Sequence, residues 1–344
     1  MASLLWTFER GSLTLAGTLR KEPSVKRTLV LIALVLGSFT AAAQTDPYPS
    51  RPIRLLLPFP PGGSVDTVAR VIGPVLAASV GQPVVVENRA GASGSIGTAE
   101  AARAKPDGYT LLLNTIPFVA NVGLYQHLPY DPIRDFAPVS LLCSSPAVLV
   151  VHPSVPARSV AELLALARAK PGVLNYSAAG AGTNPHMAGE LFNMLGGVDI
   201  VAVQYKGGGP ALVAVLGGEV GITFQNISEA VPHVSSGRLR ALGVTSTRRA
   251  AALPDVPTLA EAGVPGYEFT TWHGVLAPRA TPPQIVELLS AKLAQVLRSP
   301  EVAPRFAQMG LDIIASSPAE FSAHLGKELD KWGKLVRERH IKVE

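Results

Sequence analysis

The chain has little of what disulfide-rich and metal-rich proteins are built from, since it contains one cysteine in 344 residues. A single thiol excludes a disulfide within the chain and a multi-cysteine zinc or iron–sulfur site. Charged residues are also few, at 16%, whereas hydrophobic residues make up 47%. That balance excludes an intrinsically disordered chain, and the length corresponds to about two domains of ordinary size.

The excess of basic residues is small and lies mostly near the N-terminus. The formal net charge of +5 would by itself be compatible with binding to nucleic acid or anionic lipid. Residues 1–43 hold five Lys and Arg against two Asp and Glu, so the remaining chain has a net charge of only +2. We therefore expect no nucleic-acid partner.

The N-terminal region has the pattern of a secretory signal peptide. Lys26 and Arg27 precede an apolar run at 28–39, and three alanines follow at 41–43. The run is shorter than the roughly 17–25 residues that span a bilayer as a helix. A basic segment, a short apolar core and an Ala-x-Ala site predict cleavage after Ala43 and export from the cytoplasm, with an uncleaved anchor as the alternative.

Residues 1–24 lie upstream of this pattern and match no targeting signal. Our hypothesis is that translation starts at Val25, from a GTG codon read as Met. The mass of the N-terminal peptide of the unprocessed protein tests the hypothesis, because a mass that includes residues 1–24 would exclude it.

From about residue 51, strand-like and helix-like segments alternate. Apolar runs predict strands at 51–59, 82–87 and 110–114, and the segments 64–79 and 95–104 between them predict helices. Continuous apolar runs are typical of strands that are buried on both faces. This βαβαβ order predicts an α/β fold with a parallel sheet covered by helices.

A second alternating block follows and extends the same α/β pattern. Its predicted strands are 147–152, 174–178, 198–205, 220–225, 238–245 and 272–277, and its predicted helices are 159–169, 187–195, 210–216, 282–298, 300–309 and 318–339.

Three loops, 58–66, 179–186 and 206–210, follow the carboxyl ends of predicted strands and lead into helices. Ligands of open α/β sheets bind at that edge. A helix N-terminus presents unpaired backbone N–H groups and a partial positive charge, which favour an anion. Three such loops therefore predict a cleft that closes on an anionic group.

Five motifs in this order carry a resemblance to a known family. They are PFPPGGSVD at 58–66, VENRAG at 86–91, KPDGYT at 105–110, YKGGGPA at 205–211 and LRALGVT at 239–245. Together they resemble the Bug-type (TctC-like) periplasmic solute-binding proteins of tripartite tricarboxylate transporters, over some 295 residues from Tyr48 to the C-terminus.

The resemblance implies a two-lobed periplasmic-binding-protein fold, type II-like, with two α/β sandwich lobes joined by a hinge. Lobe I would comprise 46–147 plus 247–344, and lobe II 148–246. The implied function is capture of a small organic acid for the membrane subunits of a tripartite tricarboxylate transporter. The alternatives are presentation of the ligand to a sensor kinase and, less favoured, an exported α/β enzyme. We expect a monomer without cofactor, metal or catalytic activity.

The resemblance also implies that main-chain groups and bridging waters of two loops, 59–66 and 177–186, hold the ligand carboxylate. The residues assigned to the site are Phe59, Pro60, Gly62, Gly63, Ser64, Asp66, Ser177, Ala178, Gly180, Gly182, Thr183, Asn184, His186, Tyr205, Gly207, Gln225 and Trp272.

Several of these residues are also compatible with simpler structural roles. Gly62 and Gly63 fit a tight turn, and Ser64 and Thr183 fit helix capping. Asp66 fits the first turn of a helix, where a carboxylate is favoured, and would repel an anionic ligand at close range.

Side chains further along the chain fit simpler roles as well. Lys206 is compatible with a solvated surface charge and Trp272 with core packing. His186 and Glu190 are spaced i, i+4, but two metal ligands without a third are a weak indication of a metal site.

Two positions depart from the family pattern. The family commonly has acidic residues where this chain has Gly221 and Gln225, which weakens the case for an amino-acid ligand. His273 stands where an aromatic residue is common, and as a pocket donor it would make affinity depend on pH.

Enzyme motifs are not found in the sequence. The segment 91–95 lacks the final glycine of a Gly-x-Ser-x-Gly nucleophile elbow, and neither a phosphate-binding loop nor a His-Glu-x-x-His pair occurs.

Overall fold

The computed structural model describes residues 48–339 and 341. The predicted signal peptide and the hypothesis on the start codon lie outside these residues. Among the helices described, none is both long enough and apolar enough to cross a membrane.

The first strands of the chain form a parallel sheet. Strand β1 (Ile53–Leu57) lies between β2 (Val84–Asn88) and β3 (Thr110–Asn114), and both pairings are parallel. Helices α2 (Ser64–Val80) and α3 (Ser95–Ala102) connect them. The predicted βαβαβ order is confirmed.

The sheet continues through two antiparallel strands, so it is parallel among β1, β2 and β3 and mixed as a whole. Strand β9 (Thr270–Pro278) pairs antiparallel with β3 and with β4 (Phe136–Val151), and the short strand β10 (Asp312–Ile313) also pairs antiparallel with β4. Strand β4 begins at Phe136, well before the predicted start at 147. The prediction missed the first half of the strand because prolines and serines interrupt its apolar pattern.

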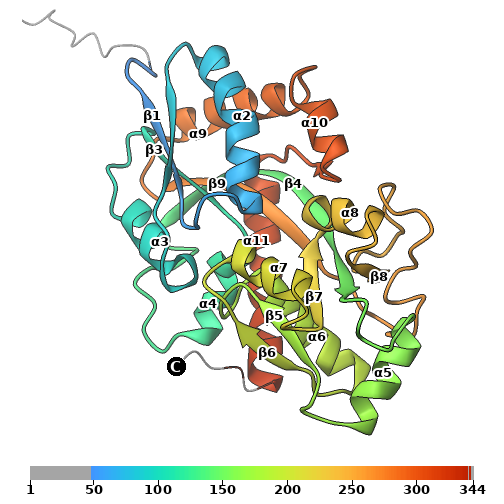
Figure 1. Ribbon diagram of the computed structural model, residues 1–344. Helices are drawn as coiled ribbons and strands as arrows, with labels where there is room; N and C mark the ends of the chain where they lie inside the picture. The colour runs from blue at the N-terminus through green and yellow to red at the C-terminus, as the bar shows by residue number, and fades with distance from the viewer. Residues whose placement is uncertain (1–47, 340, 342–344) are drawn as a thin grey trace, which may run out of the picture. The chain divides into compact units, whose positions relative to one another are not determined.

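Beyond β4 the remaining strands complete one ten-stranded sheet (Figure 1). Eight of its strands follow the order β2-β1-β3-β9-β4-β7-β5-β6, and β8 and β10 each pair with β4 outside this order. Strands β5 (Asn175–Ala178), β6 (Val201–Gln204) and β7 (Ile222–Asn226) are parallel to one another. Strand β8 (Arg240–Val244) and β7 both pair antiparallel with β4. The lobe boundary predicted at 147/148 falls inside β4, which takes part in both regions of the sheet.

Eight further helices complete the described structure, together with a short 3₁₀ turn, η2 (Ala92–Gly94). They are α4 (Pro117–Leu124), α5 (Val160–Ala169), α6 (Asn184–Gly196), α7 (Gly208–Leu216), α8 (Ile227–Ser235), α9 (Pro283–Leu297), α10 (Ala303–Gln308) and α11 (Pro318–Glu338).

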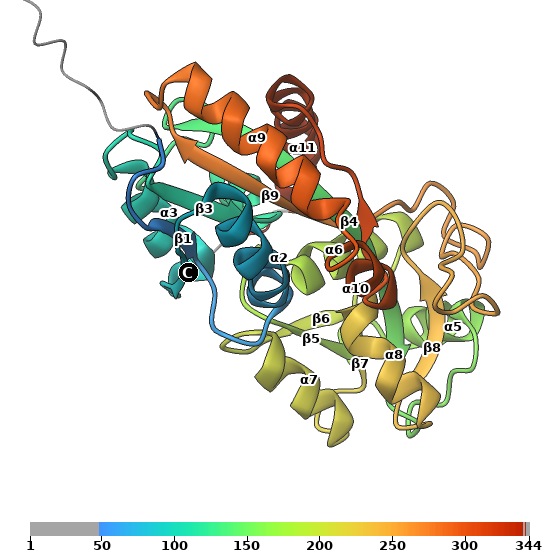
Figure 2. The same ribbon diagram turned by 90° about the horizontal axis from the view of Figure 1, so that it is seen from above.

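Helices cover both faces of the sheet, and the side chains of β1 alternate between them. Leu55 and Leu57 pack in a cluster with α2 and α9, whereas Leu56 packs with α4 and α11. Figures 1 and 2 show α2 and α9 side by side over the same part of the sheet. Burial on both faces explains why these strands read as continuous apolar runs.

A buried glycine allows α11 to approach β9 closely. A Cβ added at Gly274 would lie 2.1 Å from Cζ of Phe321, whose side chain is fully buried. We expect Gly274→Ala to lower the free energy of unfolding by about 1–3 kcal/mol, the usual cost of overpacking a core. Urea denaturation measures this, with Gly326→Ala as control because a Cβ there meets nothing within 4 Å. Equal stability of the two variants would contradict the packing described.

Candidate functional site

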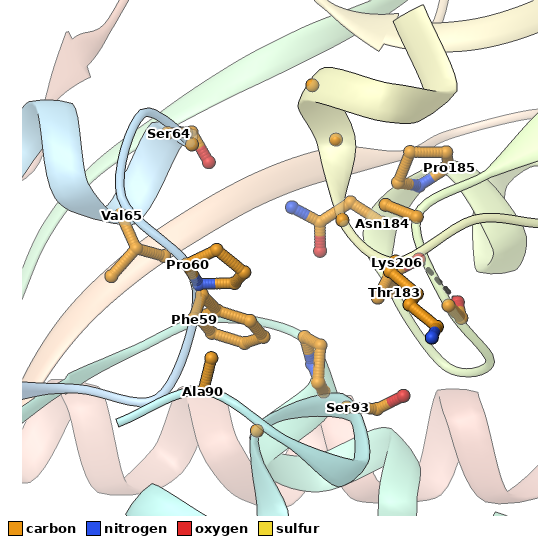
Figure 3. A pocket seen from close by; sticks show the side chains of 18 of the residues that line it. Phe59, Pro60, Ser64, Val65, Ala90, Ser93, Thr183, Asn184, Pro185 and Lys206 are labelled. Atoms are coloured by element: carbon orange, nitrogen blue, oxygen red, sulfur yellow. Dashed lines mark hydrogen bonds between the residues drawn. The ribbon is translucent and has the colours of Figure 1, made fainter. Parts of the chain in front are cut away.

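A pocket of about 580 Å³ lies at the carboxyl ends of the parallel strands. Its wall is formed by segments that follow β1, β2 and β3 and by segments that follow β5, β6 and β7. In Figure 3, Phe59, Pro60 and Ser64 lie on one side, and Thr183, Asn184 and Pro185 face them from the other. This is the sheet edge at which the sequence predicted a ligand site.

Five helices begin at the pocket, because the N-cap residues of α2, α3, α6, α7 and α8 all line it. Helices α2, α6 and α7 start directly after Gly63, Thr183 and Gly207, and all three of these N-cap residues line the pocket without a side-chain capping bond. The first N–H groups of each helix have no intrahelical acceptor. The pocket is therefore bordered by backbone donors and by the positive ends of these helix dipoles.

Two glycines bring the loops on opposite sides of the pocket into contact. Gly207 has φ +112°, and a Cβ there would lie 3.6 Å from Cγ of Pro60. Gly180 has φ +117°, and a Cβ there would lie 3.4 Å from Oγ of Ser93. A Cβ would fit the space at both positions, so it is the positive φ, strained for any other residue, that requires glycine here.

Two polar atoms in the pocket wall have no hydrogen-bond partner among the residues described. They are Oδ1 of Asn184 and Oγ1 of Thr115, and both side chains are buried. Buried polar atoms are nearly always hydrogen-bonded, so these two mark places where a ligand or a water would complete the site.

Comparison with known proteins identifies the family. A family model described as the tripartite tricarboxylate transporter family receptor matches residues 68–341. The chain belongs to this family. It is similar to BugT of Bordetella pertussis, with 38% identity over 93% of this chain and all of the relative. It is 40% identical to a protein encoded between tcbD and tcbE in Pseudomonas sp. strain P51, over 92% of this chain and 95% of that protein.

Two solved structures with similar sequences have a similar fold. A Rhodopseudomonas palustris protein, Rpa4515 with adipate, has 36% identity and a TM-score of 0.82 over 86% of this chain and all of its own. MatC of the same organism, with bound malate, has 34% identity and a TM-score of 0.79, over 84% of this chain and all of its own. The predicted resemblance and the predicted fold class are confirmed.

Of the site residues predicted for this family member, the structure brings eleven to the pocket wall. They are Phe59, Pro60, Gly62, Gly63, Ser64, Gly180, Thr183, Asn184, Tyr205, Gly207 and Gln225.

The structure does not bring the other six to the pocket wall, namely Asp66, Ser177, Ala178, Gly182, His186 and Trp272. Ser177 and Ala178 are fully buried within β5, where their backbones pair with neighbouring strands.

Asp66 instead fixes the loop that carries the pocket residues. Its carboxylate accepts hydrogen bonds from the backbone N–H of Gly62 at 3.0 Å, from Asn88 at 3.1 Å and from Arg70 at 2.8 Å. Burial opposes ionisation of Asp66, but these hydrogen bonds outweigh burial and lower its pKa below the usual range. This agrees with the structural role considered for Asp66 from its sequence position.

His186 and Gly182 are bonded to each other behind the pocket wall. The backbone N–H of Gly182 donates to Nδ1 of His186 at 3.0 Å, and burial lowers the pKa of this imidazole. Glu190 accepts hydrogen bonds from Tyr176 and Arg339 instead of sharing a metal with His186. Residues 48–339 and 341 contain no group of three or more His, Cys, Asp or Glu placed to hold a metal ion.

Trp272 and His273 lie in the core of the sheet. Trp272 is 1% exposed, and its indole N–H donates to Oε2 of Glu328 at 2.8 Å. His273 is fully buried beside Cys143, with 3.8 Å between Nδ1 and Sγ, and does not line the pocket. The structure thus favours the packing role for Trp272 and gives His273 no position from which to donate to a ligand.

Burial of His273 has a consequence for stability in acid. Desolvation lowers its pKa from 6.5 to about 4. As the pH falls below 6.5, His273 becomes protonated in the unfolded chain but stays neutral in the folded chain until about pH 4. The folded state therefore loses stability between these two pH values. By linkage the loss is about 3 kcal/mol.

We expect His273→Gln to lose less stability than the wild type between pH 7 and pH 4, by about that amount. Urea denaturation of both proteins at the two pH values measures the difference. Equal losses in the two proteins would contradict the burial of a neutral His273.

Some pocket residues were not assigned from the sequence. The segment 90–94 lines the pocket, and its glycines and serine after a predicted strand were an available signal. Asn226 and Glu229 also line it. Glu229 lies on α8, a helix that the sequence did not predict because Pro232 and several polar residues interrupt its apolar pattern.

Proposed function

We propose that this protein captures a small organic carboxylate in the pocket. The observation that carries the proposal is the convergence of helix N-termini, among them those of α2, α6 and α7, on one pocket. Backbone N–H groups at such ends bind anions without a buried Arg or Lys. Similar proteins solved with adipate and with malate support the assignment.

In this proposal the pocket is the cleft between two lobes, 46–147 plus 247–344 and 148–246. A ligand that bonds both to the loop after β1 and to the loop after β5 would stabilise a closed arrangement relative to an open one. Its effect on the equilibrium is set by its difference in affinity for the two states. Strand β4, common to both regions of the sheet, would form part of the hinge.

The proposed biological setting is transport. The protein would be exported to the periplasm by its signal peptide, act as a monomer and deliver its ligand unchanged to the membrane subunits of a tripartite tricarboxylate transporter. Membership in a family of transporter receptors supports this role over catalysis.

A thermal-shift screen over a panel of organic acids tests the proposed function. A ligand at a hundredfold excess over its Kd stabilises the folded state by about 2.7 kcal/mol, which raises the melting temperature by several degrees. We expect at least one small carboxylate to do so, and its neutral amide analogue not to. No shift with any acid of the panel would contradict the proposal.

A further inference from the structure

Glu229 is the single acidic side chain in the pocket wall, as far as the described part of the chain shows. It lies in the first turn of α8, directly after β7. Within the same described residues, Lys206 is the single basic member of that wall. The N-terminus of α8 favours a carboxylate in this first turn, and the surroundings of Glu229 indicate what else it does there.

Two neutral amides orient the Glu229 carboxylate. The Nε2 group of Gln225 donates to its Oε2 atom, and Gln225 is 2% exposed. Asn226 also hydrogen-bonds the carboxylate, while its own Oδ1 accepts from Thr271 at 3.2 Å. A carboxylate is an acceptor only, so these bonds fix its position without neutralising its charge.

No cation in the described structure pairs with Glu229. Across residues 48–339 and 341, no Lys, Arg or His nitrogen lies within 4.0 Å of its carboxylate oxygens. Burial raises the pKa of Glu229, and the bonds from Asn226 and Gln225 only partly offset that effect. Glu229 is half-buried, and a charge that is partly withdrawn from water without an ionic partner carries a free-energy cost. Glu229 therefore has no ion-pair partner within 4.0 Å among the described residues, although Lys206 lies in the same pocket wall.

We propose that Glu229, together with Gln225, binds the ammonium group of a ligand whose carboxylate is held at the helix N-termini, so that the ligand is an amino acid rather than a dicarboxylate. This inference rests on the proposed function. It also revises the expectation drawn from Gln225 alone, because the acid missing at 225 is present one helical turn further on.

The remaining acceptors suit an ammonium group. An ammonium has three donors, and Glu229 offers its carboxylate oxygens. Since the amide nitrogen of Gln225 faces the carboxylate, its Oε1 atom is a further acceptor, and no bond to it is found in the described structure. A second carboxylate placed here would meet a like charge and two acceptors, which disfavours a fully ionised diacid.

Calorimetry with ligand pairs of equal carbon count tests the inference. The pairs are 4-aminobutyrate and succinate, 5-aminopentanoate and glutarate, and 6-aminohexanoate and adipate. We expect the amino acid of the best-fitting pair to bind at least tenfold more tightly than its diacid. Glu229→Gln keeps the size and the bond to Gln225 and should remove that preference.

Glu287→Gln serves as the control, because it removes the same charge from an exposed position on α9. It should retain the wild-type preference. A diacid bound as tightly as its amino acid, or a preference that survives Glu229→Gln, would overturn the inference and leave the proposed function standing. If no member of any pair binds, the inference fails, whereas the proposed function fails only if no acid of the wider thermal-shift panel binds.

Discussion

Gly63→Trp is expected to weaken binding of the tightest ligand at least a hundredfold while leaving the protein folded. Gly63 is the N-cap of α2 and lines the pocket. Its φ of −80° suits any residue, and a Cβ there would have no neighbour closer than 3.9 Å, the carbonyl oxygen of Pro60. The backbone thus accepts a side chain, but an indole would occupy the pocket and cover the N–H groups at the start of α2. Calorimetry with the tightest acid of the matched pairs measures the loss.

Gly326→Trp is the matched control for this experiment. Gly326 lies on α11, away from the pocket, and a Cβ there meets nothing within 4 Å. Both variants should unfold within about 1 kcal/mol of the wild type, since the substituted sites are open. Unchanged affinity in Gly63→Trp would contradict the assignment of the loop after β1 to the ligand site.

Glu328→Ala is expected to lower the free energy of unfolding by about 2–6 kcal/mol. One oxygen of Glu328, Oε2, accepts the indole N–H of both Trp272 and Trp332 at 2.8 Å. Both indoles are 1% exposed, and each buried donor left without an acceptor costs about 1–3 kcal/mol. The residue holds α11 against β9, so the effect should appear in urea denaturation as a lower midpoint.

Glu328→Gln separates the loss of the acceptor from the loss of charge. The amide carbonyl oxygen has two lone pairs and can accept both indoles as Oε2 does. We expect this variant to stay close to the wild type in stability and to bind ligand normally. If Glu328→Gln were as unstable as Glu328→Ala, the charge and not the shared acceptor would be the stabilising feature.

The sequence predicted most of the elements that border the pocket. Strand β3 was predicted with the bounds that the structure shows, and the predicted end of α2 came one residue too early. Such segments combine continuous apolar runs with glycine and proline at their ends, so local pattern and tertiary burial agree. The direction of β9 was not predictable in this way, because pairing direction depends on residues distant in the chain.

The candidate site was likewise predictable only where its signal lies within one short segment of the chain. The loops after β1, β5 and β6 were predicted because each combines glycine with the start of a helix, and that combination is local. Trp272 was assigned to the ligand although it bonds Glu328, and that partner is 56 residues away. Glu229 was missed because its helix contains a proline and because only the folded sheet brings β7 beside β5.

The most direct test of the account is a crystal structure of the protein with the tightest acid of the matched pairs. We predict a ligand carboxylate oxygen bonded, directly or through one water, to backbone N–H groups at the starts of α2 and α6. A ligand bound elsewhere would contradict the account. One such place is the groove of about 490 Å³ that Arg168 and Arg339 line on another part of the surface.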